Sequence, residues 1–147
     1  MTTYESLLSV LYNVIKNAGL FDTVYDYERL VDNKKFQELF VSGGKIDACT
    51  ITRNSTKDNE YVANMIILRN YEFTIRLYMS VDDANASEKT FNTKIDALLD
   101  LLDTNSDLLA SSEIVMPSQL EIAEPRLVAG VLVHFARIKI VLQVSVQ

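Results

Sequence analysis

The chain has 147 residues, a length that fits one domain, 1–147, burying about 70% of the surface that its unfolded chain exposes. Its 14 Lys and Arg against 20 Asp and Glu give a net charge of −6 and an isoelectric point near 4.7, which argues against tight nucleic-acid binding because that affinity comes from basic contacts with phosphates. No apolar run reaches the ~18 residues of a membrane-spanning helix, and the N-terminus lacks the basic start of a secretory signal, so we expect neither a membrane partner nor secretion.

An amphipathic helix opens the predicted fold. Thr2-Thr3-Tyr4-Glu5 fits a capping box, apolar residues then recur at helical spacing over 4–18, and Gly19 supplies a stop. The acidic segment that follows is irregular, with a short strand expected at 24–27 and another element at 36–41. The N-terminal part of the chain therefore predicts one helix and at most two short elements.

Two strands are predicted in the middle of the chain. Residues 45–53, rich in Thr and Ile, favour the first strand, and the wholly polar loop 54–60 leads into Tyr61 and the apolar run 65–68, a pattern typical of a hairpin with a long solvated tip. Within the stretch 69–83, apolar residues occupy every second position from 71 to 79, which is the period of a strand with one buried face. We expect that face to pack on the helices; its residues are Tyr71, Phe73, Ile75, Leu77 and Met79.

A second amphipathic helix follows this strand. Asp82 or Asp83 can cap its start, and Asn105 and Ser106 mark its end. Its apolar stripe has the width that a core-facing helix needs. The stripe consists of Phe91, Ile95, Leu98, Leu99 and Leu102.

The C-terminal part predicts two strands of unequal length. A polar connection containing Pro117 precedes a short strand at 119–123, which Pro125 breaks, and 131–147 forms a long final strand. The apolar face of this strand changes phase near Phe135, which indicates a bulge or a sharp bend. At about 3.3 Å per residue the strand would reach ~55 Å against a domain diameter of ~40 Å, so it either bends or projects. Together the elements predict an α+β fold, with an antiparallel or mixed sheet of about four main strands packed against two amphipathic helices.

Few residues are candidates for catalysis. His134, the only histidine, lies between two apolar residues without a recognisable partner, which favours a structural role. Cys49, the only cysteine, lies in an apolar, Thr-rich run typical of a buried inert thiol. The segment Ser42-Gly43-Gly44-Lys45 lacks the first glycine and the magnesium-binding hydroxyl of a phosphate loop. We therefore predict that the protein is not an enzyme and uses no cofactor or metal.

Two sets of charged residues are candidates for a subunit interface. Three aspartates at i, i+4 and i+7 share one face of the second helix, while basic and tyrosine side chains lie on the polar faces of two strands. Both sets fit ordinary solvated faces, and the aspartates also fit a metal or acid–base site. Alternatively, a neighbouring subunit covers them, because Tyr and Arg are enriched at buried interfaces. The candidates are Arg76, Tyr78, Asp96, Asp100, Asp103, Arg137 and Lys139.

The order of elements, with several short segments, resembles the tail terminator (minor tail protein U-like, tail completion) proteins of long-tailed bacteriophages. These segments are the helix end Asn17-Ala18-Gly19-Leu20, the residues Val24-Tyr25-Asp26-Tyr27, the strand 71–78 that runs directly into Asp82-Asp83, and the helix core 94–100. The resemblance covers nearly the whole chain. It departs at the polar tip 54–60 and the connection 103–118, so loop contacts do not carry over.

The resemblance implies a structural subunit of the virion. It implies a closed homo-oligomeric ring, a hexamer, at the head-proximal end of the tail tube, which stops tube polymerisation and joins head-completion (neck) proteins. DNA would cross the lumen without specific binding, and assembly would take place in the bacterial host cytoplasm. Two other functions remain open at this stage: a neck or head-completion protein, and a ferredoxin-like module that binds a ligand in a discrete pocket.

Overall fold

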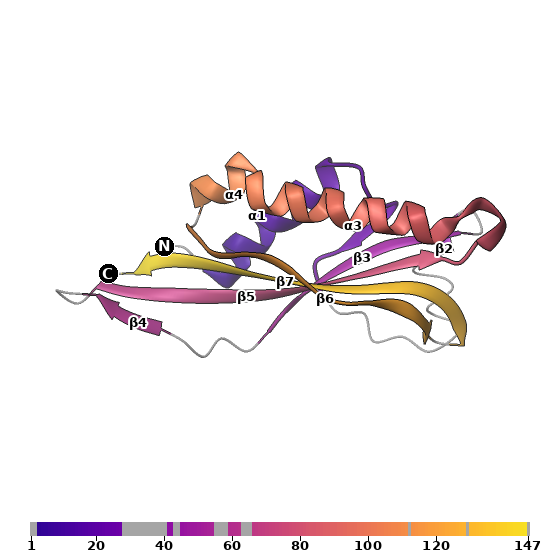
Figure 1. The fold of residues 1–147 in the computed structure, drawn as a ribbon. Helices are drawn as coiled ribbons and strands as arrows, with labels where there is room; N and C mark the ends of the chain where they lie inside the picture. The colour runs from indigo at the N-terminus through magenta and orange to yellow at the C-terminus, as the bar shows by residue number, and fades with distance from the viewer. Residues whose placement is uncertain are drawn as a thin grey trace.

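Helices lie on one face of a long, twisted sheet in the computed structural model of the chain (Figure 1). The structure describes residues 3–27, 41–42, 45–54, 59–62, 66–111, 113–128 and 130–146. The described helices and strands are α1 (Tyr4–Asn17), β1 (Thr23–Tyr25), β2 (Val41–Ser42), β3 (Lys45–Arg53), β4 (Asn59–Val62), β5 (Ile66–Ser80), the 3₁₀ turn η1 (Asp83–Asn85), α3 (Ser87–Thr104), α4 (Ser106–Ser111), β6 (Glu113–Val128) and β7 (Val131–Val146). This arrangement confirms the predicted α+β fold.

The sheet is mixed and follows the order β1-β3-β5-β7-β6, with β2 paired to β3 and β4 paired to β5. β1 runs parallel to β3, and the other described pairs are antiparallel. The predicted hairpin differs in its partners, because β4 pairs with the start of β5 and β3 pairs with the later part of β5. β4 and the adjoining ends of β5 and β7 extend past the helices (Figure 1), so one end of the long final strand does project.

The apolar face of β5 forms the centre of the main core, as its alternating sequence predicts. All five of its predicted apolar residues are buried and contact the helices. Phe73, Ile75 and Leu77 are completely enclosed, and each such side chain stabilises the fold by about 1.5–3 kcal/mol. The helix residues in the same cluster include Leu7, Leu11, Ile15, Phe91, Ile95, Leu98 and Leu102.

The starts of the two long helices differ from their predicted caps. At α1, Thr3 rather than Thr2 is the N-cap: its hydroxyl accepts the Ser6 amide at 3.2 Å, and the Ser6 hydroxyl accepts the Thr3 amide at 2.8 Å. Neither predicted aspartate caps α3, because Asp82 precedes η1 and Asp83 is the first residue of η1. Ala86, in the left-handed region with φ 53°, occupies the N-cap position instead.

The region between α3 and β7 is more regular than its sequence predicts. In place of a long polar connection the structure has α4 and then β6, which continues past both Pro117 and Pro125. The prediction that Pro125 breaks the strand is therefore wrong. β6 is an edge strand. Proline has no N–H to donate, and it is tolerated in an edge strand where the backbone nitrogen faces away from the neighbouring strand. Its pairing with β7 shifts register between Ile114 and Met116, between Met116 and Gln119, and between Leu120 and Ile122.

The final strand β7 changes its apolar phase without a bulge. Its register with β5 is unbroken from Ile67 opposite Val146 to Ser80 opposite Val133, so the bulge, one of the two predicted causes of the phase change, is wrong. The phase changes because the sheet face away from the helices has a small core of its own. This second cluster consists of Ile46, Ala48, Tyr78, Val133 and Phe135.

Candidate interaction surfaces

The sheet face opposite the helices brings together three of the predicted basic residues. The β5–β7 register places Arg76 directly opposite Arg137, and Lys139 lies two residues further along β7. Two guanidinium groups in directly opposite positions repel each other. The Arg76 guanidinium also donates a hydrogen bond to the Thr52 hydroxyl of β3, at 2.8 Å. We call Arg76, Arg137 and Lys139 the basic cluster.

Two glutamates offset part of this charge within the chain. Glu72 binds the Lys139 ammonium at 2.7 Å, and this hydrogen bond raises the pKa of Lys139. Glu121 lies 3.6 Å from Arg137, which is longer than the 2.7–2.9 Å typical of a charge-assisted hydrogen bond. Arg137 and Lys139 thus each have a glutamate of the same subunit as a partner.

Tyr78 does not belong to the basic cluster. It retains only 8% of its accessible surface and packs on Phe135, with ring centroids 5.5 Å apart. Its position in the second cluster follows from the same alternation that places it on the face away from the helices. Within the subunit Tyr78 therefore acts as a core residue and offers little area to a partner.

The aspartates on α3 divide into two kinds. Asp96 and Asp100 are exposed, and no ion pair of either carboxylate occurs among the residues that the structure describes. Asp103 instead accepts a hydrogen bond from the Ser118 amide at 2.8 Å, and the Ser118 hydroxyl donates to the carbonyl of Leu99. Asp103 thus ties α3 to the edge strand β6, whereas Asp96 and Asp100 face solvent.

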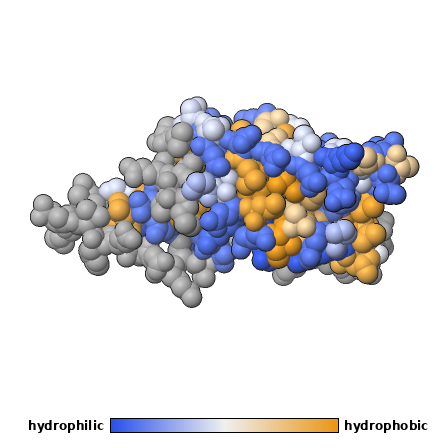
Figure 2. All heavy atoms as spheres, in the orientation of Figure 1, coloured by the Kyte–Doolittle hydropathy of each residue, from blue (hydrophilic) through white to orange (hydrophobic). Residues whose placement is uncertain are grey.

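An apolar strip lies along the β6–β7 hairpin. Figure 2 shows apolar surface beneath α3 and again at the end of the molecule where the hairpin turns, with hydrophilic surface around both. Three exposed leucines define this strip: Leu120, Leu127 and Leu132, with 42%, 75% and 51% of their surfaces exposed. Leu127 and Leu132 are opposite each other in the register, so they form a single apolar tip.

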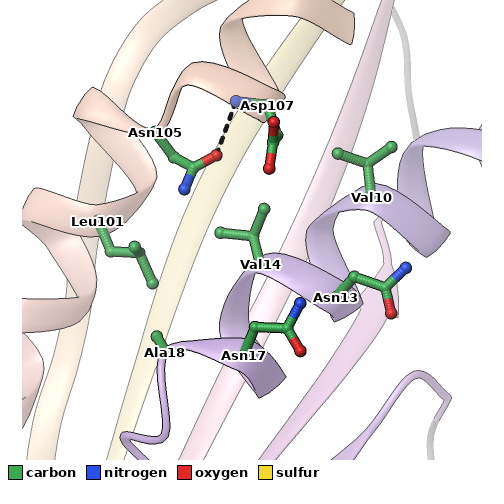
Figure 3. Close-up of a pocket in the computed structure, with 8 residues that line it drawn as sticks. All are labelled: Val10, Asn13, Val14, Asn17, Ala18, Leu101, Asn105 and Asp107. Carbon is green, nitrogen blue, oxygen red and sulfur yellow. Dashed lines mark hydrogen bonds between the residues drawn. The ribbon is translucent and has the colours of Figure 1, made fainter.

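A groove separates α1 from the C-terminal end of α3 and from α4 (Figure 3). It has a volume of about 580 Å³. The Asn105 side chain accepts the Asp107 amide at 2.9 Å and so caps α4. With apolar side chains and asparagine amides along its walls, the groove suits a contact with another polypeptide better than acid–base chemistry. Its lining residues include Val10, Asn13, Val14, Asn17, Ala18 and Leu101.

A buried hydrogen bond joins the start of α3 to β7. The Ser87 hydroxyl lies 2.8 Å from His134 Nε2 and accepts the Asp82 amide, also at 2.8 Å. The His134 ring stacks on Phe91, with centroids 5.5 Å apart. Both polar side chains are buried, and this bond ties strand, turn and helix together. His134 thus has the partner that a structural histidine needs, but Ser87 is 47 residues away in sequence and no local pattern could have indicated it.

A second groove, of about 500 Å³, collects polar groups of both signs where β3 and β5 meet the start of α3. The Lys94 ammonium forms an ion pair with Asp47 at its wall. The other carboxylate oxygen of Asp47 is buried and has no hydrogen bond within the described part of the chain. Lys45, Asp82 and Ser87 also line this groove, which is the kind of pocket expected of a ligand-binding module.

Comparisons with known proteins add no relative. No protein-family model matches the chain, and no curated protein matches it significantly. In the described ranges, no three His, Cys, Asp or Glu side chains are grouped so that they could hold a metal ion. None of the described helices is long and apolar enough to cross a membrane.

Proposed function

We propose that this protein is a structural virion subunit that assembles with copies of itself into a ring, a hexamer, at the head-proximal end of a phage tail tube. The ring terminates tube polymerisation and provides the surface to which a head-completion protein binds. The element order on which the resemblance rests, helix, strands, Leu-rich helix and two further strands, is the order that the structure has.

The apolar strip is the observation that carries this proposal. Exposed apolar surface bounded by polar residues is typical of a site that another protein covers. Leu127 and Leu132 lie together at the tip of a hairpin, where neither contributes to either core cluster. Their exposure is explained if the strip is buried on assembly.

The charge of the chain suits a ring through which DNA passes. A subunit with a net charge of −6 repels the phosphate backbone, so DNA would cross the lumen without adhering to it. The partners are then other protein subunits: copies of this chain, the tail tube protein and the neck protein. A closed ring also requires two different patches on each subunit, because a head-to-tail contact joins unlike surfaces.

Negative-stain imaging and light scattering of the purified protein, with and without tail tube protein from the same phage, test this function. We expect rings, or tubes capped at one end. Replacing both tip residues, Leu127→Asp with Leu132→Asp, should abolish them, whereas Val81→Asp, an exposed apolar residue outside the strip, should not. A monomer that leaves tube growth unchanged would contradict the proposal.

The groove at Lys94 and Asp47 favours one second candidate, a module that binds a small polar ligand. Its mixed charges and the unsatisfied carboxylate oxygen of Asp47 would be explained by a ligand that donates a hydrogen bond there. Thermal-shift screening of amines and amino acids against the wild type and Asp47→Asn tests this candidate. A ligand that stabilises only the wild type would support it.

A further inference from the structure

We infer that the apolar tip of one copy, Leu127 with Leu132, inserts into the groove between α1, α3 and α4 of the next copy. This inference rests on the proposed ring and deepens it, because it names both patches of the contact between neighbouring subunits. The occupant is a second copy of this chain. We call its binding site the α1–α4 groove; the apolar residues that line it are Val10, Val14, Ala18 and Leu101.

The apolar tip is a projection that the subunit itself leaves uncovered. Leu127 is the most exposed large apolar side chain among the described residues, and Leu132 lies directly opposite it in the register. The hairpin carries this pair at one end of the molecule (Figure 2). Beside the tip, Glu124 and Arg126 form an ion pair at 2.7 Å, so these two side chains add no net charge there. The tip therefore suits an apolar, uncharged socket.

The α1–α4 groove matches the tip in size and in chemistry. Val14 on α1 and Leu101 on α3 line facing walls (Figure 3). The groove volume of about 580 Å³ exceeds the roughly 240 Å³ that two leucine side chains need, if each carbon takes the ~30 Å³ of a liquid water molecule. Room remains for the backbone of the turn. Asn13 and Asn17 can bind its peptide groups, because neither amide has a hydrogen-bond partner among the described residues.

The tip cannot fill the groove of its own subunit. β6 begins beside α4 and ends at the tip (Figure 1). Its two ends pair with Gln143 and Val131 of β7, so about 40 Å of strand separates them. Complementary patches at opposite ends of one chain make a head-to-tail contact, which forms a ring when the rotation between neighbours closes. A contact between two tips would instead be isologous and would stop at a dimer.

The tip and the groove would anchor a larger interface. Two leucine side chains alone cannot supply the ~800 Å² that each partner of a stable interface buries. A few side chains inserted in a pocket carry most of the binding energy, however, while the contacts around them mainly exclude water. Copies with a net charge of −6 repel each other, so an apolar anchor supplies attraction that their overall charge does not.

Complementation between two defective variants tests the contact. The tip variant is Leu127→Asp with Leu132→Asp. The groove variant is Asn13→Glu with Ala18→Glu, which places carboxylates at exposed positions of the groove wall. Each variant alone is expected to raise the concentration needed for half-assembly by at least about a hundredfold in analytical ultracentrifugation. Circular dichroism checks that each variant is folded.

A mixture of the two variants retains one intact junction. The tip of the groove variant can still enter the groove of the tip variant, whereas the reverse junction brings carboxylates together. The mixture should therefore form a heterodimer that does not grow. A mixture that stays monomeric would overturn the inference.

A matched control separates the groove from net charge. Asn92→Glu with Thr93→Glu adds the same two charges at exposed positions of α3 that do not line the groove. This control should assemble as the wild type does. A groove variant that assembles equally well would overturn the inference, and so would a control that fails as the groove variant does.

Cross-linking at high protein concentration separates this inference from the proposed function. A chain carrying Asn13→Cys and Leu132→Cys, treated with a short bismaleimide, should give a ladder of covalent oligomers. Leu132→Cys alone should stay monomeric. Cys49 does not interfere, because it is buried and burial raises the pKa of its thiol.

The outcomes of the cross-linking experiment are distinct. Rings without a ladder would overturn this contact and leave the proposed ring intact. A ladder from open oligomers that cap no tube would support the contact and contradict the proposed function. Covalent dimers of Leu132→Cys alone would show a contact between two tips and would overturn the inference, and the absence of both ladder and rings would contradict both proposals.

Discussion

The hydrogen bond between Ser87 and His134 gives the sharpest test of how the subunit is held together. Ser87→Ala removes the hydroxyl that lies 2.8 Å from Nε2 of His134. His134→Phe keeps an aromatic ring against Phe91 but removes the nitrogen. The two single variants and the double variant form a double-mutant cycle across one buried bond.

The expected magnitudes follow from what each change leaves unpaired. Ser87→Ala leaves a buried imidazole nitrogen without its partner, which costs about 1–3 kcal/mol, and it also removes the acceptor of the part-buried Asp82 amide. His134→Phe costs about 1 kcal/mol, because the Ser87 hydroxyl still accepts the Asp82 amide. The double variant loses the acceptor of the Asp82 amide, as Ser87→Ala does, but leaves no unpaired imidazole nitrogen, so its loss should be smaller than the sum of the single losses by about 1 kcal/mol.

Urea unfolding followed by circular dichroism measures all four free energies of unfolding. The m value should stay constant, so that shifts in the midpoint report stability alone. Losses that add within about 0.3 kcal/mol would show that Ser87 and His134 do not interact, and the structural role assigned to His134 would be wrong.

Two further predictions concern Cys49 and Ala86. Burial, and secondarily Asp47, raises the pKa of the Cys49 thiol. The folded state therefore keeps a proton that the unfolded state loses above pH ~8.5. The free energy of unfolding must then fall as the pH rises. Between pH 7 and 9.5 the wild type should lose about 1.4 kcal/mol more than Cys49→Ala in urea unfolding, and parallel losses would contradict the assignment. Ala86→Gly should raise the free energy of unfolding by about 0.5–1 kcal/mol, because relief of left-handed strain at φ 53° exceeds the added chain entropy. A lower melting temperature in calorimetry would contradict this second expectation.

The sequence predicts β5 and α3 well because each has one buried face and one polar face. Alternation over 71–79 and the stripe from Phe91 to Leu102 both reflect contact with a single neighbouring layer, and the structure buries both, with Leu99 only partly enclosed. β6 has no such pattern. β6 pairs with β7 on one side only, and its register shifts move side chains from one sheet face to the other. Its sequence therefore lacks a regular alternation of apolar and polar residues.

The candidate surfaces were predictable in part. Because side chains alternate between the two faces of a strand, the sequence alone places Arg137 and Lys139 on one face of β7. That Arg76 lies opposite Arg137 depends on the register of β5 and β7, which this alternation does not determine. Helical spacing shows only the direction in which Asp103 points, so it groups Asp103 with two exposed aspartates. Its partner Ser118 lies in a part of β6 that the sequence predicts as a polar connection.

The edge strand β6 limits the kind of contact that copies of this subunit could make in the proposed ring. An open edge invites strand addition, and repeated strand addition leads to aggregation rather than a closed ring. β6 carries Pro117 and Pro125 in a ladder with three register shifts, and these are features with which natural proteins block edge pairing. Contacts on this side must then use side chains, and the exposed leucines of the apolar strip lie on this hairpin. Because side-chain patches fix the rotation between neighbours, a contact of this kind can close at a defined subunit number, as the proposed ring requires.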